Sequence, residues 1–173
     1  DKYDYLQGCK SDSLHNIAKT VAICSAFTEG VQLFASFAIL LNFPRHNKMK
    51  GMGQIITWSV RDETLHCNSM IRLFNELMKE NPEVWTTKLK DEIFKACSIA
   101  VAQEDAMIDL AFEQGPLENL NANEVKQYIR WIANRRLTQL GLDPLYKANK
   151  NPLTWLDSIL NAVEHMNFFE GRS

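Results

Sequence analysis

Apolar residues recur along most of this chain at intervals of three to four positions, which is the period of an α-helix. The first such segment can begin at Ser11 or Ser13, either of which is a suitable helix cap, and residues 21–43 are apolar on nearly every side. That pattern is typical of a central, fully buried helix of a bundle. Gly30 lies inside the run and costs about 1 kcal/mol relative to Ala in a helix, so it indicates a kink or a close packing contact.

Three more long helices and a short one are predicted downstream. Asn121 and Glu124 form an Asn variant of the capping box, and Gly141 is a suitable helix stop. No strand-like alternation is visible, so the pattern predicts an all-α fold with residues 1–173 as a single helical domain. The predicted helices cover residues 54–79, 82–113, 121–140 and 155–163.

Composition narrows the functional class. The chain is 46% hydrophobic and 23% charged with a net charge of −2, which is ordinary for a soluble globular protein and gives no sign of nucleic-acid binding. Residues 21–43 are long enough to cross a membrane, but Glu29 near their middle costs about 2.5–3.5 kcal/mol there. A buried helix is therefore favoured over a membrane span.

The cysteines and the chain start bear on location. Cys24, Cys67 and Cys97 lie in apolar helical surroundings and show no disulfide spacing, which indicates reduced core residues. Since no signal peptide is visible either, we expect a cytoplasmic protein. The chain begins at Asp1 rather than Met, so we expect it to start inside a longer protein.

The strongest candidate for chemistry is a carboxylate and an imidazole on one predicted helix. Glu63 and His66 are three residues apart, which places them within about 60° of each other on the helix surface. Apolar neighbours such as Val60 and Leu73 continue that face, so we expect the pair to point into the core. Glu29, on an antiparallel neighbouring helix, could converge with them. Inward-facing Glu-x-x-His pairs supply ligands in di-iron bundles.

Plainer interpretations remain open for each of these residues. A Glu-x-x-His spacing also occurs as a surface pair, and Glu29 could reach the end of the bundle or pair with an arginine. Asp12 and His15 form a rival pair, interpreted as a solvent-facing helix start. The chain has neither a nucleophile motif nor a phosphate-binding loop, so metal redox chemistry is the favoured hypothesis.

A series of short motifs runs in order along nearly the whole chain. They are Thr28-Glu29-Gly30, Ser36-Phe37-Ala38, Arg61-Asp62-Glu63-Thr64-Leu65-His66-Cys67, Lys126-Gln127-Tyr128-Ile129, Ala133-Asn134-Arg135, Leu140-Gly141, Asn151-Pro152 and Asn167-Phe168-Phe169-Glu170-x-Arg172. Together these motifs resemble one family, the small, radical-generating subunit of class I ribonucleotide reductase. The resemblance implies a ferritin-like helical bundle.

The resemblance also implies roles for particular residues. Glu29, Glu63 and His66 match ligands of a centre of two iron ions, or of an iron–manganese pair. Asp62 matches a carboxylate that orients a metal-bound histidine from the other half of the subunit and lies on the electron-transfer route. The radical pocket is matched by Leu33, Phe37 and Ser59, although the family usually has an aromatic at the first position and an aliphatic residue at the third.

The ligands of the family's first half and its radical-bearing tyrosine have no counterpart here, so the chain resembles the second half of a subunit. We expect the remaining metal ligands to come from a missing N-terminal half and the 173-residue piece alone to be inactive.

The implied function is that of the ribonucleoside-diphosphate reductase small subunit, a homodimer. Its metal centre activates O₂ and generates a radical that passes to the large catalytic subunit, where ribonucleotides are reduced to deoxyribonucleotides. Two alternatives stay open: another ferritin-like di-metal oxidase or monooxygenase, and a helical scaffold that only dimerises.

Overall fold

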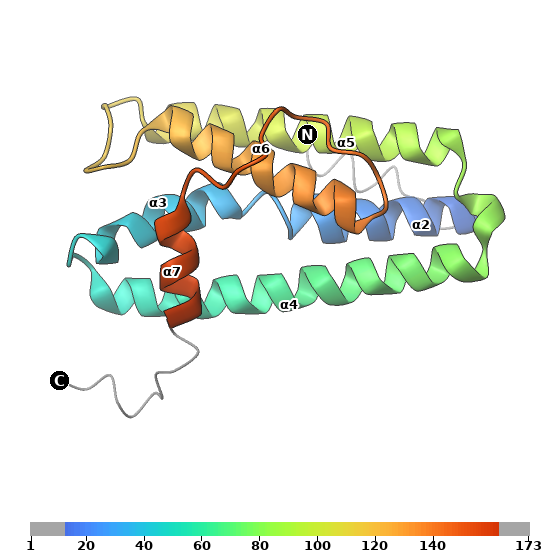
Figure 1. Ribbon diagram of the computed structural model, residues 1–173, viewed down its shortest axis with the longest axis horizontal. Coiled ribbons are helices and arrows are strands. Elements are labelled where there is room, and N and C mark those ends of the chain that lie inside the picture. The colour runs from blue at the N-terminus through green and yellow to red at the C-terminus, as the bar shows by residue number, and fades with distance from the viewer. Residues whose placement is uncertain (1–12, 163–173) are drawn as a thin grey trace.

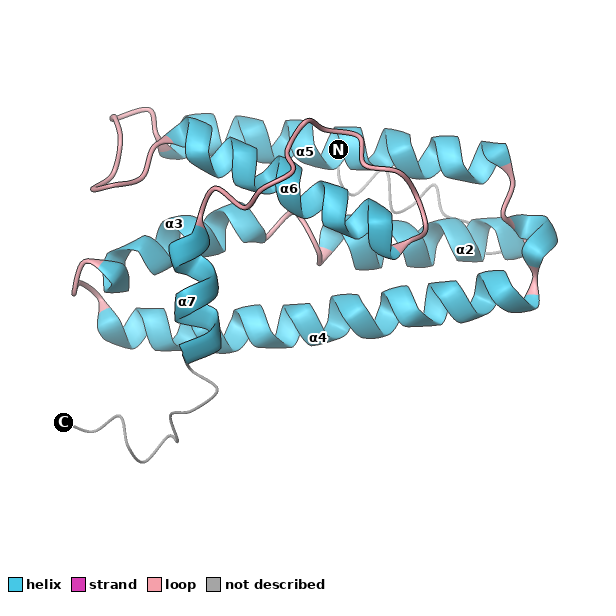
Figure 2. Cartoon of the chain, viewed as in Figure 1, coloured by secondary structure: helices cyan, strands magenta, loops and turns pink. Residues whose placement is uncertain are grey.

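The computed structural model describes residues 13–162, and within them the fold is all-α, as predicted (Figure 2). These residues form no strand, and the only β-type pairing recorded in them is an isolated bridge between Leu117 and Leu120. In chain order the elements are α2 (Leu14–Ile23), the π-helical segment η1 (Cys24–Thr28), α3 (Phe34–Arg45), α4 (Lys50–Glu80), the short 3₁₀ segment η2 (Pro82–Val84), α5 (Thr87–Ala111), α6 (Ala122–Gln139) and α7 (Thr154–Ala162).

The helices pack in layers around the first apolar segment. Figure 1 shows α2 and α3 following one another through the middle of the bundle, with α4 running back along one side and α5 with α6 on the other. The short α7 crosses the bundle. This arrangement buries the segment that the sequence marks as apolar on all sides. The largest fully buried side chains include Phe27, Leu41, Phe74, Ile93 and Ile129.

The first apolar segment is interrupted, which corrects the prediction of one helix through residues 21–43. Between α2 and α3 the chain passes through η1 and then a turn over residues 29–33. The amide of Glu29 donates to the carbonyl of Cys24, 3.0 Å away, which is the wide spacing of a π-helix. The kink that Gly30 indicated is thus confirmed, and it occurs beside the buried acid.

Local signals located several helix ends correctly. Asn121 and Glu124 form the reciprocal capping box at the start of α6. Gly141, at a φ of 80°, follows the end of that helix, where a left-handed residue is favoured. Ser13 caps α2 by accepting from the amide of Asn16.

Other boundaries differ from the prediction. α4 begins at Lys50, before the predicted residue 54. Gly53 therefore lies inside its first turns, where the Pro44 ring packs so close to the backbone that a side chain would not fit. Pro44 itself lies inside α3, which continues to Arg45. The segment after Asn81 is a 3₁₀ turn, and α5 starts only after the cap residue Thr86.

Two sequence expectations concern the environment of the chain. Among residues 13–162, none of the helices combines the length and the apolar character that a membrane crossing needs. Cys67 and Cys97 are buried, Cys24 is half-buried, and these three residues form no disulfide.

Asp12 and the Asn167-Phe168-Phe169-Glu170 motif lie outside the described residues.

Candidate metal centre

Glu29 enters the site from the turn that follows η1. Its backbone is still near-helical, with φ −87° and ψ −32°, but the chain leaves the helix at the next residues. The Oε2 atom of its carboxylate is buried and has no hydrogen-bond partner among the described residues. A buried carboxylate oxygen without a partner costs free energy until a ligand or a water molecule binds it, so this atom is open to a cation.

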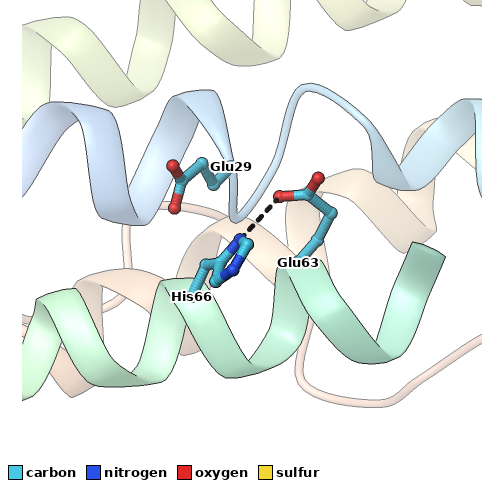
Figure 3. Close-up of side chains that lie close together, drawn as sticks. All are labelled: Glu29, Glu63 and His66. Atoms are coloured by element: carbon cyan, nitrogen blue, oxygen red, sulfur yellow. Dashed lines mark ion pairs between the residues drawn. The ribbon is translucent and has the colours of Figure 1, made fainter. Parts of the chain in front are cut away.

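α4 supplies the other two groups from one face. The Oε2 atom of Glu63 lies 3.9 Å from the Nδ1 atom of His66, one helical turn further on. Figure 3 shows Glu29 on the segment that faces α4, across from this pair. One ligand atom from each of the three residues lies within 4.8 Å of the others. The predicted convergence of the three residues is therefore present in the fold.

This arrangement fits a metal ion. Carboxylate oxygens and imidazole nitrogens bind transition metals at about 2.0–2.2 Å, so two ligands of one ion can be about 4 Å apart. In two-metal sites the ions are about 3.5–4 Å apart. Separations within 4.8 Å therefore need only small side-chain rotations to enclose a cation, and a cation would satisfy the buried Glu29 oxygen.

The expectation that the α4 pair points into the core is wrong for the described residues. The side chain of Glu63 is 28% exposed and that of His66 is 61% exposed. Leu73, assigned to the same inward face, is 53% exposed. The reason is packing: α4 buries Val60 and Cys67 against α2, η1 and α3, and His66 lies at the edge of that contact.

Cys67 follows His66 on α4, and the charges of the site act on the pKa of its buried thiol. Burial raises the pKa of its thiol, the positive charge of Arg136 opposes this shift, and Glu29 and Glu63 add to it. The two carboxylates and the arginine thus act on one buried atom. The metal-free thiol is therefore held in its protonated form.

The remaining predicted residues surround these three, and their roles stay predictions. Ser59 lies one turn before Glu63 on α4 and is half-buried, with its hydroxyl donating to the Ile55 carbonyl, 3.3 Å away. Leu33 is the half-buried cap residue of α3. Phe37 is buried, and its ring meets Phe34 edge-on, with the ring centroids 5.7 Å apart. Asp62 is exposed on α4.

The rival histidine has a different partner. His15 was expected to face solvent, but it is half-buried because α5 packs against α2. Its Nε2 atom lies 2.8 Å from the Oε2 atom of Glu92 on α5. This contact links two helices, and within the described residues His15 is not among the groups that could hold a metal ion.

Arg136 was not among the candidate site residues singled out from the sequence. The residue is 4% exposed, and its Nε donates to the carbonyl of Gly30, 3.1 Å away. The available signal was its position on the apolar line of α6, with Ile129, Ile132 and Leu140. A charged residue on such a line requires a specific buried partner.

Together the helical bundle and its convergent carboxylate–imidazole group define a ferritin-like helical protein. Within that class, residues 1–152 match the family described as ribonucleotide reductase, small chain, and the chain belongs to this family.

Relatives and solved structures agree with this assignment. The chain is 47% identical over 175 residues to the "Probable ribonucleoside-diphosphate reductase small subunit 048L" of Invertebrate iridescent virus 3, covering 98% of this chain and 46% of that protein. It is 36% identical to the ribonucleoside-diphosphate reductase subunit beta of Chlamydia pneumoniae, covering 94% of this chain and 46% of that protein. The ribonucleotide reductase R2 subunit from Clostridium botulinum superimposes with a TM-score of 0.82 at 26% identity, over 90% of this chain and 49% of that one. The chain thus spans about half the length of these relatives.

Proposed function

We propose that residues 1–173 are the second half of a ribonucleoside-diphosphate reductase small subunit, and that Glu29, Glu63 and His66 supply its share of a di-metal centre. The observation that carries this proposal is the approach of the three ligand atoms to within 4.8 Å of one another, with a buried and unpartnered Glu29 oxygen among them. Hard carboxylate oxygens with one imidazole suit iron and manganese.

The remaining ligands come from a segment homologous to the other half of the relatives. α4 leaves a side open for it, since Ile55, Leu65 and Leu73 are 59%, 64% and 53% exposed. Large apolar side chains gathered on one helix indicate a surface that another segment covers. His66 opens toward the same side, so docking of that segment would both bury the apolar residues and close the site.

When bound, two iron ions, or an iron–manganese pair, supply activation of O₂ and the oxidising equivalent for radical formation. The chain's own residues hold and shield the centre. Glu29 lies in a turn, and its unpartnered Oε2 is free to become a ligand. Phe37 and Leu33 exclude water from the α3 side, and Asp62 is available to orient a histidine from the other half.

The partners follow from the proposed place of the chain in the family. They are the other half of the subunit, a second copy in a homodimer, and the large catalytic subunit that reduces ribonucleotides. Reduced cysteines and an ordinary charge balance fit a cytoplasmic location.

The test compares metal content and radical formation in the full-length protein. Glu63→Ala should lose bound iron, measured by elemental analysis, and should lose the electron paramagnetic resonance signal formed after iron and oxygen are added. Glu76→Ala is the matched control, because Glu76 lies on the same helix and pairs only with Lys79 in the recorded contacts. Unchanged metal content and O₂ consumption in Glu63→Ala would refute the proposal. Ribonucleotide reduction with the large subunit distinguishes it from another di-metal oxidase.

A further inference from the structure

The turn between η1 and α3 leaves the Gly30 carbonyl outside the helical hydrogen-bond pattern. The amide of Phe34 donates to Val31, 3.0 Å away, rather than to Gly30 four residues earlier. Arg136 supplies the replacement donor, because its Nε lies 3.1 Å from the Gly30 oxygen in a buried contact. A side chain on α6 thus satisfies the backbone group next to the candidate ligand Glu29.

Burying a guanidinium to donate to a carbonyl costs free energy, because the charge loses its hydration. Arg136 is 4% exposed, and burial lowers its pKa. Within the described residues its recorded contacts are neutral groups: the Gly30 carbonyl, the Oε1 atom of Gln139 at 2.9 Å and the Phe34 ring at 5.5 Å. No carboxylate pair in that set offsets the desolvation of the charge, so stability alone gives no reason for an arginine here.

The same arginine connects to α4 through Gln139. The Nε2 atom of Gln139 lies 3.3 Å from the Oδ1 atom of Asn68, two residues beyond His66. The backbone oxygen of Gln139 also accepts from Asn75, 3.0 Å away. These contacts join the Glu29 turn, α6 and α4 in one continuous network.

The three segments also meet at Gly30 itself. A Cβ atom at this position would lie 2.8 Å from the Arg136 Nε, 2.8 Å from the Cys67 sulfur and 2.4 Å from the Ala26 oxygen. Only a glycine lets the turn approach α4 and α6 this closely. Gly30 follows the candidate ligand Glu29, and Cys67 follows the candidate ligand His66. The close approach of Gly30 to Cys67 therefore sets the distance between the turn and α4 right beside two of the ligands.

We propose that Arg136 is a positioning residue for the metal centre: by holding the Gly30 carbonyl and, through Gln139, α4, it fixes the spacing between the segment that carries Glu29 and the helix that carries Glu63 and His66. This inference rests on the proposed function. α6 carries none of the three candidate ligands, yet it determines how far apart they lie. Residues that orient ligands without touching the metal usually change its affinity about 10- to 100-fold when replaced.

The test measures Mn²⁺ binding to the full-length, metal-free protein, with free Mn²⁺ followed by electron paramagnetic resonance. Arg136→Met should weaken binding by about 10-fold. Arg136→Lys, which keeps a buried donor for the Gly30 carbonyl, should bind more tightly than Arg136→Met. Arg135→Met is the matched control, because Arg135 is the exposed neighbour whose guanidinium lies 4.9 Å from the Trp131 ring, and it should bind as the unaltered protein does.

Thermal unfolding of each metal-free variant separates positioning from a purely structural role. If Arg136→Met lowers Tm but leaves the Kd for Mn²⁺ unchanged, the inference is wrong. If Arg136→Met cannot be isolated in folded form, Gln139→Leu replaces it, and its Kd decides by the same criterion. Loss of Mn²⁺ binding in Glu63→Ala together with unchanged binding in the Arg136 and Gln139 variants rejects this inference and leaves the proposed function standing. Unchanged binding in Glu63→Ala rejects the proposed function itself.

Discussion

The amide of Glu29 donates a hydrogen bond of 3.0 Å to the carbonyl of Cys24, five residues earlier in the chain. This π-type bond widens the backbone at the point where the first helix meets the candidate metal centre. π-Helical turns often occur at functional sites because the extra residue redirects a side chain. Here the redirected side chain is a carboxylate whose Oε2 is buried without a partner among the described residues.

Replacing Glu29 should separate stability from metal binding. In the metal-free full-length protein, Glu29→Leu removes the unsatisfied buried oxygen, so we expect the free energy of unfolding to rise by about 1 kcal/mol. The same change should lower the number of metal ions bound per protein, because it removes one candidate ligand. Urea unfolding and elemental analysis measure the two effects. A less stable variant that keeps its full metal content would contradict this prediction.

The Gly30 position should not tolerate a methyl group. Gly30→Ala places a Cβ within 2.4–2.8 Å of three separate segments, so we expect a loss of about 2 kcal/mol or more in the free energy of unfolding. Gly51→Ala is the control, because Gly51 lies in the first turn of α4 with no neighbouring atom within 4 Å of a built Cβ. It should be neutral or stabilising by roughly 0.5 kcal/mol. Urea unfolding of both variants gives the comparison, and equal effects would show that crowding at Gly30 is unimportant.

Asp105 and Arg130 should couple α5 to α6. Their paired contacts are 2.9 Å and 2.6 Å long, and each side chain is 25% exposed. The hydrogen bond with Asp105 raises the pKa of Arg130, as expected for a two-point contact. A double-mutant cycle with Asp105→Ala and Arg130→Ala should give a coupling of about 1 kcal/mol in urea unfolding.

The exposed pair Glu76–Lys79 is the control for that cycle. Both of its partners lie on the surface of α4, and their coupling should be smaller and should weaken further in 1 M salt, where the screening length is about 3 Å. A larger coupling for this pair than for Asp105–Arg130 would contradict the assignment of the α5–α6 contact.

The buried thiol of Cys97 should make stability fall in alkaline solution. Burial raises its pKa from 9.0 to about 12, so the folded chain keeps a proton that the unfolded chain loses. This contribution to stability is fully present below pH 9 and is lost as the pH rises toward 12. One such group changes the free energy of unfolding by at most about 1.4 kcal/mol per pH unit.

Unfolding in urea between about pH 8 and pH 10.5 tests the contribution of this thiol. Cys97→Ala should be less stable at pH 8 because it leaves a cavity, but its stability should fall less steeply with pH. Burial also raises the pKa values of Tyr128, Cys67 and Tyr146, and these groups remain in the variant. The difference between the two slopes therefore measures the Cys97 thiol together with its charge interaction with Tyr146. Parallel slopes would show that the Cys97 thiol titrates normally in the folded protein.

The sequence by itself determined the all-α fold and several helix ends, and it singled out the three candidate ligands. Helical periodicity, the Asn121–Glu124 capping box and the Gly141 stop depend on neighbours a few residues away, and such neighbours are visible in a sequence. The spacing of Glu63 and His66 follows from helix geometry in the same way.

Only the tertiary structure decided which surfaces those residues meet. Periodicity indicated an inward face for His66, but exposure depends on which segments pack against α4, and its side chain is 61% exposed. The contact between Arg136 and Gly30 joins residues 106 positions apart, so no local pattern encodes it. Contacts of this kind depend on the distance and angle between packed helices, which arise from the sum of many side-chain contacts rather than from any short stretch of sequence.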